Sequence, residues 1–472
     1  MVPDMIDRTN ESNTTDEPHA AARDLSAAET RAVSIAFHTL DEADRQHLSS
    51  RFWRWSELFD RDPDARIAQH PEHLLSQQMH EPQASGAALA PRSSDVVTST
   101  TGGLTPPRSP RHCDDVVLCE ASRGQEVVAL GILAPKSMTL RQAGGFGLNV
   151  GLRGYRLVGN RLLGPADESL TREMLAACAS FAREHRASYL LIEDLERNDP
   201  LFAAAESLKR DGFRLFSPTG IQERLKIEFP PNPADYWAKF SSKTRNTFKR
   251  KQKKIGTTRL VRVTEPTQIA DFLETAHAIS MRTWQSDKLG LRIHNNAQEL
   301  RLFTFLATQQ ALRSYLLFVD EQPAAFLFGT QHKGLFSYEE VGYVREFSDR
   351  SPGQVLLVQV LEDLLKDTTP RVFDFGGGAA DYKQLFATTT STSGNVWLVP
   401  PGLRPQFCLA YLRGCRTLDR TARAIADKLG ATTLLRQLVR GKLSAATAVT
   451  RDSNRVEDGQ VENLPNDERG TP

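Results

Sequence analysis

A short loop, Arg350-Ser351-Pro352-Gly353-Gln354, stands between a predicted strand and a predicted helix. A helix N-terminus presents unpaired backbone N–H groups and the positive end of the helix dipole, and both suit a pyrophosphate. Glycine at position 353 lets a phosphate come close to the backbone, and Arg350 adds charge-assisted hydrogen bonds. The pattern predicts a phosphate site at Arg350, Ser351, Gly353 and Gln354. The alternative is an ordinary Ser-Pro-Gly helix start.

Two adjacent carboxylates lie on the strand that precedes this loop. Alternation along a strand places Tyr338 and Glu340 on one face, and Glu339 and Tyr343 on the other. A carboxylate beside a reacting nucleophile can remove its proton, directly or through water. Glu340 is our first candidate for this base and Glu339 the second. The alternative is that one or both simply face solvent.

A third group of residues follows the next predicted strand. Asp374 is followed by three glycines, which give the loop room to pass close to a ligand, and Asp381-Tyr382-Lys383 open the next helix. Lys383 can neutralise developing negative charge or hold an anionic acceptor. The alternative is a glycine turn before a helix whose Tyr382 packs in the core.

The elements that must position these residues repeat along the chain. The second half reads as strand, two helices, three-strand meander, helix, strand, helix, strand. The ranges are 259–264, 269–284, 297–312, 314–320, 324–331, 335–344, 354–367, 371–376, 381–387 and 395–400. The first half shares the meander, helix, strand, helix and closing strand at 221–229. This order predicts an α/β fold (α+β layers) in which each half has a mixed central sheet flanked by helices.

The 472 residues exceed one ordinary core, so we expect two domains with tails. The predicted divisions are a disordered tail at 1–29, an N-terminal half at 30–229 with a flexible insertion at 81–112, a C-terminal domain at 230–400, a basic helical extension at 401–444, and a disordered tail at 445–472.

Composition excludes several classes of protein. The five cysteines form no CxxC pair and no histidine stands at zinc-ligand spacing, so we expect neither a disulfide framework nor a metal. The first residues do not read as a signal peptide, and no run of 18 apolar residues exists. A cytoplasmic location is therefore expected.

Two segments are strongly basic although the formal net charge is only +1. Residues 243–254, on a helix predicted over 235–254, carry seven basic side chains and no acid, which suits a phosphate-bearing ligand, an anionic acceptor or nucleic acid. A solvated face of a connecting helix is the interpretation we favour, so the nucleic-acid signal is not strong. Residues 404–442 combine arginines with an apolar stripe, the pattern of peripheral membrane contact or of packing on the domain.

Four sequence segments of the second half resemble one family. DYWAKFSSKTRNTFKRKQKK, YLLFVDEQPAAFLFG, SPGQVLLVQVLEDLL and FDFGGGAADYKQLFA resemble the GNAT acetyltransferases of bacterial cellulose and exopolysaccharide synthesis, a group similar to the Fem aminoacyl transferases. The resemblance covers 230–400, and 110–229 by element order, and implies tandem GNAT-like domains. Arg350 and Gly353 match the family's phosphate-binding motif, and Val355 departs from it.

The resemblance also implies a chemistry. An acyl group, such as acetyl, would move from acyl-CoA to an amine or hydroxyl of a small-molecule or saccharide acceptor. Tyr382 would protonate the leaving thiolate, and Arg282, Trp284 and Lys288 would line the acceptor pocket. The first half lacks an Arg-x-x-Gly helix start, so we expect it to shape the acceptor cleft. Two alternatives remain, an aminoacyl transferase that uses charged tRNA and a non-catalytic scaffold. The oligomeric state is not indicated.

Overall fold

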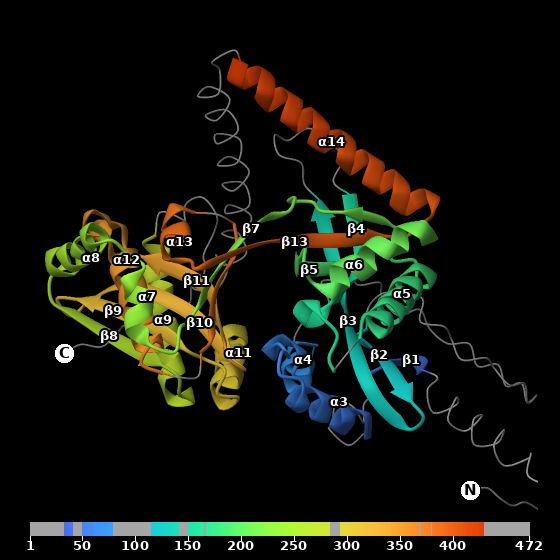
Figure 1. Cartoon of the computed structure of the whole chain (residues 1–472), viewed down its shortest axis with the longest axis horizontal. Helices are drawn as coiled ribbons and strands as arrows, with labels where there is room; N and C mark the ends of the chain where they lie inside the picture. Colours follow the sequence, from blue (N-terminus) through green and yellow to red (C-terminus); the bar gives the residue numbers. More distant parts are fainter. Residues whose placement is uncertain are drawn as a thin grey trace, which may run out of the picture.

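The computed structural model describes residues 33–40, 50–78, 115–140, 150–164, 167–283, 293–367, 370–378 and 380–428. These residues form two halves that share one mixed sheet flanked by helices (Figure 1). The predicted α/β class with a mixed central sheet is therefore confirmed. The segments predicted to be disordered, at 1–29, 81–112 and 445–472, lie outside the described residues.

The first half runs as strand, two helices, three-strand meander, helix, strand, helix and two further strands. Its elements are β1 (Val33–Thr39), α3 (Ser50–Arg61), α4 (Pro71–Gln78), β2 (Val117–Arg123), β3 (Glu126–Leu140), β4 (Val150–Leu157), α5 (Glu168–Glu184), β5 (Leu190–Glu196), α6 (Pro200–Ser207), β6 (Arg214–Phe216) and β7 (Gln222–Glu228). The predicted helix at 168–185 and the hairpin that begins at 116 are confirmed.

The second half repeats this order from β8 to β13. Its elements are α7 (Pro233–Ala238), α8 (Ser242–Ile255), β8 (Thr258–Val263), α9 (Ile269–Met281), α11 (Ala297–Thr308), β9 (Ser314–Val319), β10 (Gln322–His332), β11 (Leu335–Tyr343), α12 (Pro352–Leu364), β12 (Val372–Gly377), α13 (Asp381–Phe386), β13 (Thr389–Val399) and, after it, α14 (Leu403–Lys428). The repeat is more complete than predicted, because β1, α3 and α4 match β8, α9 and α11 in order.

The two halves exchange their last strands. β7, predicted to close the first half, lies instead between β12 and β13. β13 pairs with β7 along Thr389–Ser393 and then with β5 along Ser393–Leu398. Alternation of side chains marks a strand but does not name its partner, which is why the sequence misassigned β7. Main-chain hydrogen bonds therefore tie the halves together.

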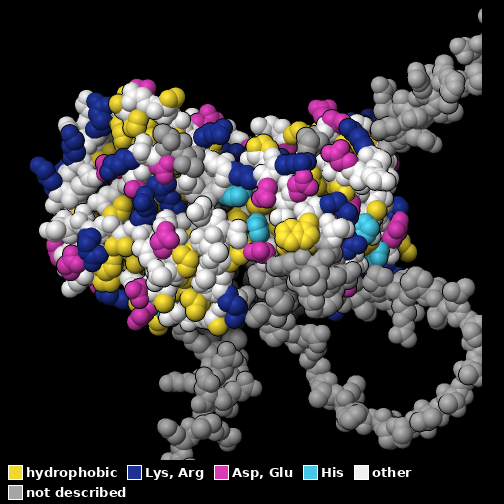
Figure 2. All heavy atoms as spheres, turned by 90° about the horizontal axis from the view of Figure 1, so that it is seen from below, with side chains coloured by type: hydrophobic (Ala, Val, Ile, Leu, Met, Phe, Trp, Pro, Cys, Tyr) yellow, Lys and Arg dark blue, Asp and Glu magenta, His cyan; other side chains and the backbone are white. Residues whose placement is uncertain are grey.

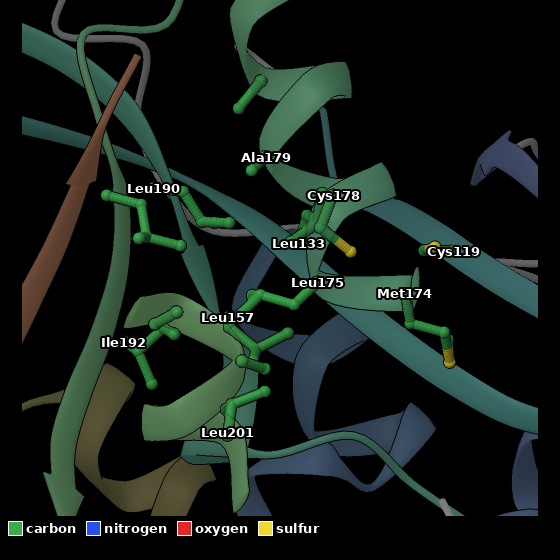
Figure 3. Close-up of a cluster of buried hydrophobic side chains, with 14 of the residues drawn as sticks. Cys119, Leu133, Leu157, Met174, Leu175, Cys178, Ala179, Leu190, Ile192 and Leu201 are labelled. Atoms are coloured by element: carbon green, nitrogen blue, oxygen red, sulfur yellow. The ribbon is translucent and has the colours of Figure 1, made fainter. Parts of the chain in front are cut away.

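The core of the first half lies between α5 and the sheet (Figure 3). Met174, Leu175 and Cys178 on α5 recur at helical spacing and are fully buried. They pack with strand residues that include Cys119, Leu133, Leu157, Leu190 and Ile192. This core packs α5 and α6 against the sheet of the first half.

A buried arginine network fastens β9 to the end of α12 in the second half. Arg313 is only 4% exposed, and its guanidinium lies 2.8 Å from Asp363 Oδ2 and 2.9 Å from Asp367 Oδ2. Its Nε also donates to the Tyr315 hydroxyl at 2.7 Å. Burial alone would raise the pKa of Asp363, but hydrogen bonds from Arg313 and Tyr315 hold that pKa below its ordinary value.

The junction between the halves is formed by the β10–β11 turn and the C-terminal end of α3. The Lys333 ammonium donates to the carbonyls of Phe59, Asp60 and Asp62, where a helix end leaves carbonyls unpaired. The His332 ring stacks on Phe59 with centroids 5.2 Å apart. Figure 2 shows histidine side chains where the two lobes meet.

Acid is expected to weaken this junction. Burial lowers the pKa of His332 from 6.5 to about 4, and the Lys333 charge acts in the same direction. Between pH 6.5 and 4 the unfolded chain binds a proton that the folded protein does not, so the free energy of unfolding falls as the pH falls. The loss from His332 is roughly 1–3 kcal/mol after allowance for its partial exposure.

The measurement is urea unfolding at pH 7.5 and 4.5 for the parent and His332→Phe. The Nε2 atom of His332 is buried without a hydrogen-bond partner, so phenylalanine keeps the stacking and loses only the titration. We expect a smaller pH dependence in the variant. Some dependence should remain, because burial also lowers the pKa of His73 to about 4. An equal dependence in both proteins would contradict the prediction.

The prediction of a single basic helix over 235–254 is wrong, because the structure has two helices in this range. α7 ends at Ala238, and Ser241 begins α8 by accepting a hydrogen bond from the Thr244 N–H at 3.2 Å. A serine favours a helix start over a helix interior for this reason.

The last strand of the second half is longer than the predicted strand at 395–400. β13 begins at Thr389, six residues earlier, because its polar first half pairs with β7.

Candidate active site

The candidate site lies where β11 and β12 stop pairing. These strands are parallel, and their pairing covers only Leu335–Ser337 against Val372–Asp374. Beyond it stand the two candidate carboxylates on β11 and the glycines after Asp374. Ligands of open α/β sheets bind outside the carboxyl ends of neighbouring parallel strands. The fold therefore brings the predicted base and the glycine loop to the same place.

A β-bulge changes which side chains share a face of β11. Glu340 lies opposite Phe328 and Tyr338 opposite Gly329, so Glu339 is the extra residue between them. Because Phe328 and Gly329 are neighbours on β10, Glu340 and Tyr338 lie on opposite faces. The alternation that placed them on one face is therefore wrong, and the register places the two glutamates together instead.

Glu339 has the surroundings of a proton acceptor. Its Oε1 accepts a hydrogen bond from the Thr330 hydroxyl at 3.3 Å, and the residue is exposed to solvent. Burial raises the pKa of the Glu339 carboxyl above its ordinary value, Thr330 acts against this, and the nearby Asp374 charge adds to it. A carboxylate with a raised pKa is a better base near neutral pH.

Tyr382 lies at the start of α13 on the opposite side of β12 from this acidic group. Its hydroxyl is hydrogen-bonded to that of Tyr338, and its ring contacts Phe375 with centroids 6.4 Å apart. Burial raises the pKa of Tyr382, and the hydrogen bond with Tyr338 partly opposes this. The phenol is therefore protonated at neutral pH, and the ring is 37% exposed.

Lys383 turns toward the backbone. Its ammonium donates to the carbonyl of Phe375 at 2.8 Å and contacts that of Gly377 at 3.4 Å. Burial lowers the pKa of Lys383, which the Asp374 charge opposes. In this arrangement Lys383 holds the glycine loop, whose Gly376 and Gly378 have φ of 71° and 89°. Its predicted contact with developing negative charge stays a prediction.

Sequence reasoning missed a buried ion pair behind the glycine loop. Arg224 on β7 lies 2.7 Å from Asp374 Oδ2 and 3.4 Å from Asp194 of the first half. Asp374 in turn accepts a hydrogen bond from the Gly376 N–H at 2.9 Å. The first half therefore supports the shape of the loop. A single arginine in a predicted strand does not indicate an ion pair. Arg224 reaches Asp374 only because the strand exchange places β7 beside β12.

A second arginine from the first half interacts electrostatically with the same cluster. Desolvation lowers the pKa of Arg66, and the nearest charges are Asp374, which opposes this, and Arg224. Among the described residues no carboxylate lies within ion-pair distance of its guanidinium. The acidic side of the site therefore has residues of the first half beside it, and the expectation that this half shapes an acceptor cleft stays a prediction.

The equivalent helices α5 and α12 begin differently. At α5 the Asp167 carboxylate accepts a hydrogen bond from the Leu170 N–H at 2.7 Å, so an acid already occupies that helix start. At α12 Ser351 makes no side-chain cap, and Pro352 has no N–H. The α12 start has no capping carboxylate; the N–H groups of Gln354 and Val355 bond the Ser351 carbonyl, which leaves the Gly353 N–H for an external anion.

The Ser-Pro-Gly loop is also approached by the basic helix α8. Lys251 hydrogen-bonds the side chain of Gln354, and Lys254 donates to the Asp349 carbonyl at 2.7 Å. Arg350 donates to the Ile255 carbonyl at 3.3 Å, so its guanidinium rests on the end of α8. Figure 2 shows Lys and Arg side chains at the left-hand end, where α8 lies in Figure 1.

Neither Gly353 nor Val355 obstructs this helix start. A Cβ on Gly353 would meet only Tyr343, at 3.4 Å, so space lies over the loop. Val355, which departs from the family pattern, is 1% exposed and packs in the core of the second half. The Val355 side chain therefore lies in the core and not at the predicted phosphate site.

The predicted acceptor residues are described only in part. Arg282 follows α9, pairs with Glu346 at 3.1 Å and borders an open cavity of about 440 Å³ that Met281, Thr283 and Arg345 also line. Trp284 and Lys288 lie outside the described residues. Within the described ranges no group of three or more His, Cys, Asp and Glu is arranged to hold a metal ion.

Comparison with known proteins assigns a class to the second half. Residues 242–384 match the family model described as an acetyltransferase (GNAT) domain. No curated protein matches the chain. The matched range contains β11, the loop before α12, the glycine loop and most of α13, so the candidate site lies inside the range that matches the GNAT model.

Several solved structures are similar to the chain at low identity. FemX is 13% identical with a TM-score of 0.46, over 62% of this chain and 89% of that chain. L-PGS from Bacillus licheniformis is 15% identical with a TM-score of 0.39, over 61% and 86%. A tandem GNAT protein from the clavulanic acid biosynthesis pathway is 15% identical with a TM-score of 0.38, over 78% and 100%.

Proposed function

We propose that this protein is an enzyme that transfers an acyl group, such as acetyl, from acyl-CoA to an amine or hydroxyl acceptor. The GNAT domain match supports acyl transfer in general. The main support for acyl-CoA as the donor is the difference between the two helix starts. An Asp167 carboxylate caps α5, whereas no side chain caps α12. Lys251, beside Gln354, supplies a cation at the open start.

The chain's residues support direct transfer. Glu339 takes the proton of the acceptor as its nitrogen or oxygen attacks the thioester carbonyl. The carbon–sulfur bond then breaks, and the thiolate takes a proton from Tyr382. The bulge on β11 places Glu339 on one side of the strand, while Tyr382 lies with Tyr338 on the other. Glu340, on the same face as Glu339, is the alternative base.

The finer assignments rest on the sequence resemblance. We propose a saccharide or other small-molecule acceptor, a role in polysaccharide or cell-envelope synthesis, and a cytoplasmic location. The acceptor would reach the acidic side of the site from the junction with the first half, where Arg66 and Arg224 lie. An anionic substituent on the acceptor would suit the guanidinium of Arg66.

A charge placed at residue 353 is expected to abolish donor binding. Gly353→Glu puts a carboxylate at the open start of α12, whereas Gly353→Gln adds a side chain of the same size without charge. At a hundred times the dissociation constant, acetyl-CoA should stabilise the parent by about 2.7 kcal/mol. We expect a melting shift in the parent, a reduced shift in Gly353→Gln and none in Gly353→Glu.

Each outcome of this thermal melt is informative. If the two variants lose the shift equally, size rather than charge matters and no phosphate lies at residue 353. A folded parent with no shift would overturn the acyl-CoA donor. Salt-dependent binding of charged tRNA through α8, without CoA binding, would then favour the aminoacyl transferase.

A further inference from the structure

The outer face of α14 carries large apolar side chains that are exposed to solvent. Leu403, Phe407 and Leu418 are 94%, 74% and 72% exposed. At 100° per residue they fall on one side of the helix, with the small residues Ala410 and Gly414 between them. An ordered apolar stripe on an outer helix is the mark of an interaction surface.

The opposite face of α14 is fixed to the protein. Leu409 is 2% exposed and packs with Trp397, Tyr189 and Leu152. Arg416 donates to the Ser217 carbonyl at 2.6 Å, which ties the middle of the helix to the loop after β6. Because the opposite face is packed on the protein, the stripe faces outward. Figure 1 shows that one end of α14 extends away from both halves.

The charge on α14 favours an anionic occupant. Leu403–Leu418 contains three arginines and no acid, and 404–442 contains nine Lys or Arg against two Asp. At 100° per residue Arg404 borders the stripe, whereas Arg413 lies nearer the packed face and donates to the Leu215 carbonyl at 3.4 Å. A second copy of the helix would bring like charges together, so self-association is disfavoured. None of the described helices is both long and apolar enough to cross a membrane.

We propose that α14 lies in the plane of an anionic lipid surface. Leu403, Phe407 and Leu418 would enter the boundary between headgroups and acyl chains, while Arg404 contacts the headgroup phosphates. An in-plane helix of this kind gains affinity from buried apolar area and from attraction to anionic lipids. The site between β11 and β12 would then work close to a membrane surface.

The test is co-sedimentation of the full chain with vesicles of phosphatidylcholine, with and without phosphatidylglycerol. The variant is Leu403→Ser with Phe407→Ser, and the control is Trp53→Ser, which removes a 61% exposed aromatic from α3. All three positions are at the surface, and thermal melts check that each protein folds.

We expect the parent and the control to bind vesicles that contain phosphatidylglycerol, with binding that weakens at high salt. The double variant should bind at least about tenfold more weakly. Absence of parent binding would overturn the proposal, and so would equal binding of the double variant. A parent dimer that the double variant loses, without vesicle binding, would also overturn it and assign the stripe to a second copy.

Discussion

Replacement of Glu339 with glutamine is expected to lower kcat for acyl transfer by about 10²–10⁴-fold. Glutamine keeps the size of the side chain and a partner for Thr330 but cannot accept a proton. Because burial raises the pKa of the Glu339 carboxyl, kcat/KM in the parent should also fall on the acid side of a bell-shaped pH profile. The measurement is steady-state release of free thiol from acetyl-CoA with a panel of amine and hydroxyl acceptors.

Glu340→Gln is the matched control, since the two carboxylates are adjacent and on one face of β11. We expect it to lower kcat far less than Glu339→Gln and to leave the acid limb in place. The reverse result would assign the base to Glu340. Full activity in both variants would contradict carboxylate catalysis at the bulge. Absence of thiol release by the parent with every acceptor would favour the scaffold.

Replacement of Arg313 with methionine is expected to lower the free energy of unfolding by about 3–5 kcal/mol. The change leaves the carboxylates of Asp363 and Asp367 without their buried cation and removes the hydrogen bond to the Tyr315 hydroxyl. Urea unfolding followed by circular dichroism measures the loss. Repulsion between the two carboxylates should be relieved at acid pH, so the loss should shrink there.

Arg259→Met is the matched control for this experiment. Arg259 is also paired with an acid, Glu321 at 2.8 Å, but on the exposed side of β8. Exposed ion pairs contribute little, so this variant should unfold close to the parent. An effect of Arg259→Met as large as that of Arg313→Met would contradict the view that burial makes the Arg313 network costly to break.

The sequence of the second half predicted most of its local structure. The helix at 354–367 and the strands at 314–320, 324–331 and 335–344 recur within a few residues as α12, β9, β10 and β11. These elements have strong periodicity, tight turns and a Ser-Pro-Gly start, and such signals depend only on neighbouring residues. The α/β class followed from their order.

The site was predicted only as a set of separate segments. The sequence placed Glu339, Glu340 and Tyr382 near the ends of β11 and β12, and left open which carboxylate is the base. The bulge that turns Glu339 and Glu340 to one face comes from the pairing of β10 with β11. Register is a property of two strands, so no pattern within one of them could show it.

The sequence by itself determined the local elements, the repeated order and the residues able to do the chemistry. Only the tertiary structure decided that β7 and β13 change places and that Arg224 then joins Asp194 to Asp374. The reason is physical. Local hydrogen bonds and periodicity act over a few residues, whereas these strand partners and this ion pair join segments that are distant in the sequence.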